Sequence, residues 1–184
     1  MKKYNATFNL LFIIVLLGFT ACNKDPKPPS FYSLGITSDS VIEKFEKYGF
    51  NFTSMDSVYQ QPLTIGLSSD NNATIHLLGP KENLVNIKIV FRLSRQFNKS
   101  KLKLLRSYLD NMIIVVYPNW KEGNKWLEDN ALSLSRSGSR TKILNDIKLT
   151  LVLSEKPMSM GLAFGDWIKL PKYDSENQSW KLNN

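Results

Sequence analysis

Apolar residues recur at every second position in two long stretches, and this alternation constrains the fold more than any other feature of the sequence. One stretch runs from Val85 to Leu93 and the other from Ile147 to Leu153. A period of two places successive side chains on opposite faces of a strand, so each stretch predicts a strand with one buried face. The fold therefore needs a sheet, and the rest of the chain has to cover that face.

Three other segments have the 3.6-residue period and the boundary residues of helices. The first follows Ser and Thr residues that can cap a helix and stops at Gly49, and the second stops before Pro118. Turn residues such as those at 68–72 separate the expected strands. We predict helices at 41–48, from Asn98 or Ser100 to Val116 and from Glu122 to Leu134, and strands at 50–53, 63–67, 73–78, 84–93, 147–154 and 158–164.

This element order predicts an α+β fold, in which an antiparallel sheet is covered on one face by two or three helices. Each half of the chain is a helix followed by a meander, which suggests two degenerate helix-meander repeats. The order is similar to the helix-plus-sheet modules of small outer-membrane assembly lipoproteins and secreted enzyme inhibitors. A chain of 184 residues suits a single domain, which we place at 35–170 with a polar C-terminal tail at 171–184.

The first 22 residues have the parts of a secretory signal. Two lysines precede an apolar run from Leu10 to Phe19, which is shorter than the roughly 20 residues of a membrane-spanning helix. We therefore predict that residues 1–21 are a signal peptide. The run ends in Phe19-Thr20-Ala21-Cys22, which resembles the lipobox of bacterial lipoproteins, with Phe19 in place of the usual Leu.

This resemblance implies that Cys22 becomes the mature N-terminus and carries the lipid. A thioether to diacylglycerol and a further acyl chain on the new amino group would anchor the protein stably. Residues 22–34 then form a tether, since 23–30 contains three prolines. The alternative is an ordinary signal cleaved near Ala21, which leaves Cys22 as a free thiol.

The residues after Cys22 favour the outer membrane. Asn23 stands where an Asp would resemble the inner-membrane retention signal of some Gram-negative bacteria. Cys22 to Asp25 loosely resembles the surface-export tags of Bacteroidetes-type lipoproteins. Both the periplasmic face and the cell surface therefore remain open as locations.

The chain has one cysteine and one histidine, which excludes internal disulfides, a two-histidine metal site and a paired-thiolate zinc site. We therefore predict no metal and no cofactor. The histidine, His76, lies in a strand opposite Ile75 and Leu77, and we expect it on the surface rather than as a general base, since no nucleophile motif accompanies it. A hydrolase that uses a carboxylate pair is the enzymatic alternative.

Basic residues gather before and within the second predicted helix, with no acidic residue among them. They predict a surface for an anionic partner, either an acidic protein or a polysaccharide, against the alternative of a solvated helix face. Removal of Lys2 and Lys3 with the signal lowers the formal net charge by two, from +8 to +6, so this cluster holds much of the remaining excess. Nucleic acid is not expected for an exported protein. The cluster consists of Arg92, Arg95, Lys99, Lys101, Lys103 and Arg106.

Two further patterns bear on glycans. The four tryptophans could stack on sugar rings if exposed, although we expect core or edge packing for Trp120 and Trp126, which lie near a helix start. Ser40 and Ser57 lie in Asp-Ser-Val sequences that resemble the O-glycosylation sites of Bacteroidetes.

Taken together, these features predict a non-enzymatic lipoprotein of the bacterial envelope that binds a protein or glycan partner. An inhibitor or immunity lipoprotein with the basic helix as its binding surface is the second hypothesis. The carboxylate-pair hydrolase is the third.

Overall fold

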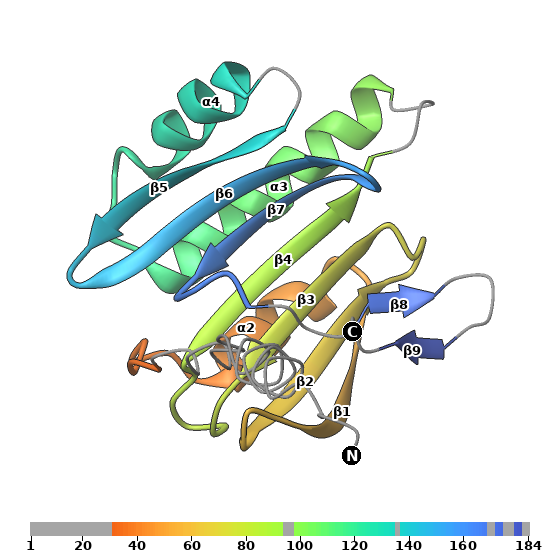
Figure 1. The fold of residues 1–184 in the computed structure, drawn as a ribbon, viewed down its shortest axis with the longest axis vertical. Helices are drawn as coiled ribbons and strands as arrows, with labels where there is room; N and C mark the ends of the chain where they lie inside the picture. Colours follow the sequence, from red (N-terminus) through yellow and green to blue (C-terminus); the bar gives the residue numbers. More distant parts are fainter. Residues whose placement is uncertain (1–30, 94–97, 135–136, 169–171, 175–178, 182–184) are drawn as a thin grey trace, which may run out of the picture.

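The computed structural model describes residues 31–93, 98–134, 137–168, 172–174 and 179–181. These residues form three helices and nine strands (Figure 1). The helices are α2 (Ser38–Glu46), α3 (Lys99–Val116) and α4 (Gly123–Ser133). The strands are β1 (Phe50–Val58), β2 (Gln61–Ser68), β3 (Ala73–Leu78), β4 (Asn86–Arg92), β5 (Gly138–Leu144), β6 (Ile147–Glu155), β7 (Met158–Phe164), β8 (Lys172–Asp174) and β9 (Ser179–Lys181).

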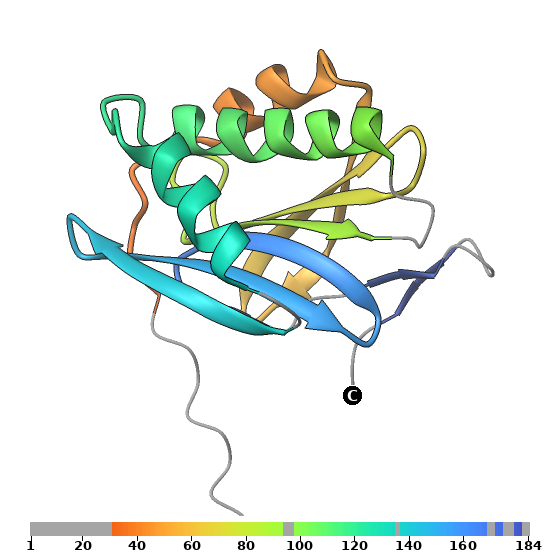
Figure 2. The same cartoon turned by 90° about the horizontal axis from the view of Figure 1, so that it is seen from above.

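Seven of these strands form one sheet in the order β1-β2-β3-β4-β7-β6-β5, and all neighbouring pairs are antiparallel. The three helices lie on one face of this sheet (Figure 2). The predicted α+β fold, an antiparallel sheet covered on one face by helices, is therefore confirmed. Helix followed by meander occurs twice, as α2 with β1–β4 and as α3–α4 with β5–β7, and the two meanders meet where β4 pairs with β7.

Helices α2 and α3 begin where the sequence supplies a capping side chain. The side chains of Thr37 and Asn98 each accept a hydrogen bond from a backbone N–H in the first turn of α2 and α3, which satisfies a donor that the helix itself leaves unpaired. Helix α3 ends at Val116, two residues before Pro118, as the sequence predicts. In the described part of the chain, no helix has both the length and the apolar character needed to cross a membrane.

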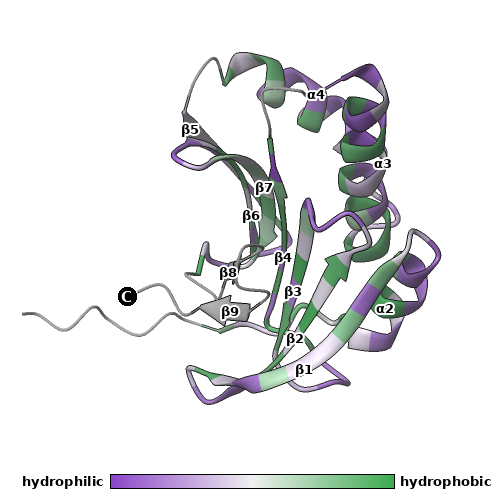
Figure 3. Ribbon diagram, turned by 90° about the vertical axis from the view of Figure 1, so that its right-hand side faces the viewer, coloured by the Kyte–Doolittle hydropathy of each residue, from purple (hydrophilic) through white to green (hydrophobic). Residues whose placement is uncertain are grey.

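The main core lies between the helices and the sheet (Figure 3). Tyr108 of α3 is at its centre, with ring centroids 5.1 Å from Phe50 and 5.4 Å from Phe91. Met112 and Phe45 are fully buried beside it. Ile87, Ile89 and Phe91 of β4 and Leu149 and Leu151 of β6 face this layer. The helices therefore cover the face that the period of two predicted.

The opposite, helix-free face of the sheet carries a second and smaller apolar cluster. It is formed by Leu63, Ile65, Leu78 and Ile168, and Phe31 packs against it. Segments from both ends of the domain thus cover the β2–β3 half of this face. Because Leu34 is also buried and donates its backbone N–H to Leu84, the packed part of the chain begins before residue 35.

His76 lies in this covered region, and the expectation of a surface histidine is wrong. It is only 3% exposed. In the register of the sheet it is flanked by Ile65 on β2 and Lys88 on β4. The alternation placed it correctly on the face opposite Ile75, but it could not show that the ends of the domain cover that face.

The strands also differ from the prediction in number and length. Strand β5 was not predicted, because its residues Gly138 to Leu144 are mostly polar and exposed. Strand β1 extends to Val58, well beyond the predicted 50–53. Within the predicted polar tail, β8 and β9 pair as a two-stranded antiparallel sheet.

Candidate functional site

An open groove lies on the helix-free face over strands β5 and β6. Its volume is about 490 Å³, which falls within the usual range for ligand-binding sites of about 300–1,000 Å³. Small side chains, most of them with hydroxyl groups, dominate its lining, and one large aromatic ring stands among them. The lining residues are Ser137, Gly138, Ser139, Thr141, Lys148, Thr150, Val152, Leu153, Ser154 and Trp167.

The strand register explains why hydroxyl groups collect in this groove. Thr141 of β5 is directly opposite Thr150 of β6, and their Oγ1 atoms lie 3.4 Å apart. Leu149 and Leu151 alternate with Thr150 and point into the main core. The alternation that buries the leucines therefore turns a row of hydroxyl groups, each both donor and acceptor, toward the groove.

Trp167 provides the aromatic surface of the groove. Its side chain is 37% exposed, and its ring rests on Gly161 of β7. A Cβ atom at position 161 would lie 2.6 Å from Cη2 of this ring, which is much closer than van der Waals contact. The ring therefore approaches the sheet as closely as it does because residue 161 has no side chain.

The residues on both sides of Trp167 are held against the sheet. The amide of Asn86 donates to the backbone oxygen of Asp166 at 2.7 Å, and the carboxylate of Asp166 lies 3.2 Å from Nζ of Lys148. On the other side, Ile168 is buried in the second apolar cluster. Trp167 is thus an exposed aromatic residue on an anchored segment, and the charges of Lys148 and Asp166 beside it form an ion pair.

This arrangement suits a ligand that offers both flat apolar patches and many hydroxyl groups. An aromatic face can stack on the C–H groups of a sugar ring, and serine and threonine hydroxyls can exchange hydrogen bonds with sugar hydroxyls. Fixing the aromatic side chain in advance lowers the entropic cost of binding.

Trp120 and Trp126 pack as expected from the sequence. Both are partly buried against the main core, and their ring centroids lie 5.9 Å apart. What distinguishes Trp167 is its position in a turn after β7, outside any helix start. The Gly-Asp-Trp sequence at 165–167 was the available signal, but the sequence could not show which face of the sheet it lies on.

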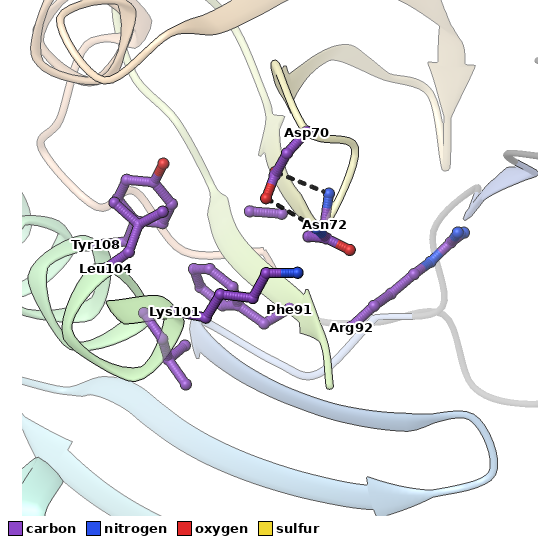
Figure 4. A pocket seen from close by; sticks show the side chains of 9 residues that line it. Asp70, Asn72, Phe91, Arg92, Lys101, Leu104 and Tyr108 are labelled. Carbon is purple, nitrogen blue, oxygen red and sulfur yellow. Dashed lines mark hydrogen bonds between the residues drawn. The ribbon is translucent and has the colours of Figure 1, made fainter. Parts of the chain in front are cut away.

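The structure brings the predicted basic residues together only in part, and Arg92 and Lys101 line the same small cavity. Lys99, Lys101 and Lys103 lie in the first two turns of α3. Arg92 ends β4 and extends away from Lys101 (Figure 4). Arg95 lies outside the described residues.

Of the α3 lysines, Lys101 lines a small cavity that is also lined by Asp70 (Figure 4). Its volume is about 20 Å³, enough for about one water molecule, so an organic ligand does not fit inside. Asp70 accepts hydrogen bonds from the hydroxyl of Ser68 at 2.7 Å and the amide of Asn72 at 2.8 Å. Burial alone would raise the pKa of Asp70, but these bonds and the charge of Lys101 outweigh it and lower that pKa.

Arg106 does not contribute a free positive charge to this surface. Its guanidinium lies 3.0 Å from the carboxylate of Glu128 on α4 and 3.8 Å from that of Asp110. Burial raises the pKa of Asp110, Arg106 lowers it and Glu128 raises it, with a net rise. Arg106 shares a helix face with Lys99 and Lys103, as predicted. Its charge is offset by Asp110, one turn along α3, and by Glu128 on α4.

The remaining predicted sites can be placed only in part. Cys22 lies outside the described residues. Ser40 and Ser57 are both exposed, and the hydroxyl of Ser40 donates to the backbone oxygen of Thr37 at 2.8 Å. Across the described ranges, no group of three or more His, Cys, Asp or Glu residues is placed to hold a metal ion.

Comparison of the chain with protein families, characterised proteins and solved structures found no match.

Proposed function

We propose that this protein is a lipid-anchored component of a bacterial cell envelope that binds a glycan, without chemical conversion, in the groove beside Trp167. The observation that carries the proposal is the combination of an exposed, anchored tryptophan with a row of hydroxyl side chains. Isolated exposed aromatic residues are common on protein surfaces. This one stands beside a groove of ligand size.

The charges in the groove favour a neutral ligand. Lys148, the charged side chain among the lining residues, is offset by Asp166 at 3.2 Å, so the lining itself has no net charge to attract an acidic sugar chain. The hydroxyl groups of Ser139, Thr141 and Ser154 each offer one donor and two acceptor lone pairs without adding charge. We therefore expect neutral oligosaccharides to bind better than uronic-acid or sulfated chains.

Binding can be tested with the full-length protein in detergent micelles and a panel of neutral hexasaccharides, namely β-1,4-glucan, β-1,3-glucan, chitin and α-mannan fragments. Calorimetry should detect at least one ligand, and W167A should weaken it at least about tenfold. The matched control is Y32A, which removes an aromatic residue that is 70% exposed and lies outside the groove. Its affinity should equal that of the wild type.

A second variant tests the hydroxyl row without touching the tryptophan. T141V keeps the β-branched shape and removes one hydroxyl group, so it should fold normally and weaken the same ligand by a factor of about 2–10. Failure of the whole panel to bind, or equal binding by wild type and W167A, would refute glycan recognition at this groove.

The anchoring part of the proposal rests on the lipobox-like sequence that ends at Cys22. A C22S variant should lose its acyl chains by mass spectrometry and move from the membrane pellet to the soluble fraction. If C22S pellets with membranes and is processed like the wild type, the anchor is not at Cys22.

A second candidate function uses the α3 lysines and an acidic protein partner. Helix α3 has three lysines in its first two turns and no acidic residue in its first turn, although the positive end of the helix dipole disfavours cations there. Three lysines at the helix start destabilise α3, but they would attract the acidic surface of a partner bound by an inhibitor or immunity protein. The small volume of the neighbouring cavity agrees with a partner that binds from outside.

This second candidate predicts an unusual combination of effects. In K99E/K103E, acidic side chains replace lysines near the start of α3, so the helix should become slightly more stable while envelope proteins captured by the wild type are lost. The matched control is K121E/K125E, which has the same spacing near the start of α4. Equal capture by K99E/K103E and wild type would eliminate this candidate.

A further inference from the structure

Lys88 is a buried lysine that faces the segment carrying Trp167. It lies on β4 and is only 4% exposed. Its position in the sheet places it opposite Ala163 on β7, which in turn is opposite Thr150 in the groove. The row across the helix-free face therefore runs from the floor of the groove directly to Lys88.

The ammonium group of Lys88 holds the backbone beyond Trp167. Nζ donates to the backbone oxygen of Ile168 at 2.7 Å. The same Nζ lies 5.2 Å from the centroid of the Trp167 ring, within the distance of a cation–π interaction. One buried charge thus contacts both the tryptophan and the residue after it.

Asn86 acts from the same strand on the residue before Trp167. Its amide donates to the backbone oxygen of Asp166 at 2.7 Å, and Asn86 is fully buried. Because residues 86 and 88 point to the same face of β4, their side chains grip the backbone on both sides of residue 167. Strand β4 therefore supplies a two-point clamp for one exposed aromatic side chain.

Holding a loop with a buried lysine is energetically unfavourable unless other contacts compensate. Removing an ammonium group from water costs free energy that contacts within the protein must offset. A methionine of similar length would fill the same space without that cost. The charge is therefore better explained by what it positions than by the stability of the fold.

We propose that Lys88 is a positioning residue for ligand recognition, whose buried ammonium fixes the backbone and ring of Trp167 in the orientation that the ligand meets. This inference rests on the proposed function of the groove. It predicts that fold stability and ligand affinity respond differently to loss of this one charge.

The test uses full-length K88M, which keeps the length of the side chain and removes the ammonium group. Hydrogen exchange of the peptide covering residues 164–168 should become at least about threefold faster, because the clamp loses one of its two points. Affinity for the hexasaccharide that the wild type binds should fall about three- to tenfold, since a mobile tryptophan must be ordered on binding. Stability in urea should be unchanged or higher.

The control separates positioning from a general loss of stability. I75V removes one methylene from β3 on the opposite face of the sheet, where Ile75 is fully buried in the main core. It should lower the stability and leave both the affinity and the exchange of 164–168 unchanged. If I75V weakens the ligand as much as K88M does, affinity follows stability and the inference is wrong.

The readouts also separate this inference from the proposed function. If the wild type binds no sugar but K88M still accelerates exchange at 164–168, the clamp exists and glycan binding is refuted, so the recognition role of Lys88 is overturned with it. If the wild type binds and K88M changes neither affinity nor exchange, only the role of Lys88 is overturned. K88R provides a further check, because a cationic donor at this position should restore more of the affinity than Met does.

Discussion

Replacing Gly161 with alanine tests whether the Trp167 ring rests on the sheet as described. The added Cβ would lie 2.6 Å from Cη2 of Trp167 and 3.0 Å from the backbone oxygen of Ile89. Ordinary contact begins at 3.4 Å, so the ring would have to move by roughly 1 Å, a shift that forfeits much of its dispersion contact. The alanine therefore disturbs the groove without removing any of its side chains.

The magnitude follows from the cost of overpacking. Forcing an extra carbon into a closely packed site costs about 1–3 kcal/mol, so G161A should be destabilised by that amount. For a chain of this size, 1 kcal/mol corresponds to a Tm change of about 2–4 °C. In the W167A background the clash with the ring is absent and only the contact with Ile89 remains, so the cost should fall to less than about half.

The assay is a double-mutant cycle by urea denaturation of wild type, G161A, W167A and G161A/W167A. Residues in contact give coupling free energies of about 0.5–3 kcal/mol, whereas independent sites add within about 0.5 kcal/mol. We expect a coupling of about 1 kcal/mol, and G161A should weaken the sugar ligand. An equal cost of G161A in both backgrounds would show that Trp167 does not rest on residue 161, and the described groove would then be wrong.

Three further predictions concern stability. M112A removes a fully buried side chain from the main core and should cost about 2–5 kcal/mol in urea denaturation, and a loss below about 1 kcal/mol would contradict its central position. N98A removes the N-cap bond of α3 and should cost about 1 kcal/mol, whereas N98S should retain most of it. The pKa of Asp70 is below its ordinary value of 3.8 in the folded protein, so its contribution is fully present above that value and is lost as the pH falls through the lowered pKa. The difference in stability between wild type and D70N should therefore be constant near neutral pH and shrink in strong acid. A difference that grows on acidification would show that the pKa of Asp70 is raised, not lowered, by folding.

Local patterns were enough to predict the layers of this fold. The alternation in β4 and β6, the caps of α2 and α3 and the stop at Pro118 are all properties of short segments. Each placed its element, although α2 spans Ser38–Glu46 and not the predicted 41–48. Strand β5 was not predicted because an exposed edge strand needs no apolar residues. Its polar residues from Gly138 to Lys142 resemble a loop until β6 pairs with them.

The site depends on contacts between distant segments, which a single sequence does not reveal. Asn86 and Lys88 read as the solvated positions of an alternating strand, yet their partners are the backbone oxygens of Asp166 and Ile168, 80 residues away. The same limitation applies to Arg106, whose partner Glu128 belongs to another helix. The residue types were visible in the sequence, but their partners were not.

Phe31, where the described part of the chain begins, packs on the helix-free face. If Cys22 carries the lipid, the nine residues from 22 to 30 span at most about 30 Å even when fully extended. The groove shares the face of Phe31, so a lipid anchor at Cys22 would confine it to a thin layer near the bilayer. The α3 lysines, on the other side of the sheet, would face away from that membrane. The two candidate binding surfaces would then face different parts of the envelope. The length of the tether would limit which ligands each surface can reach.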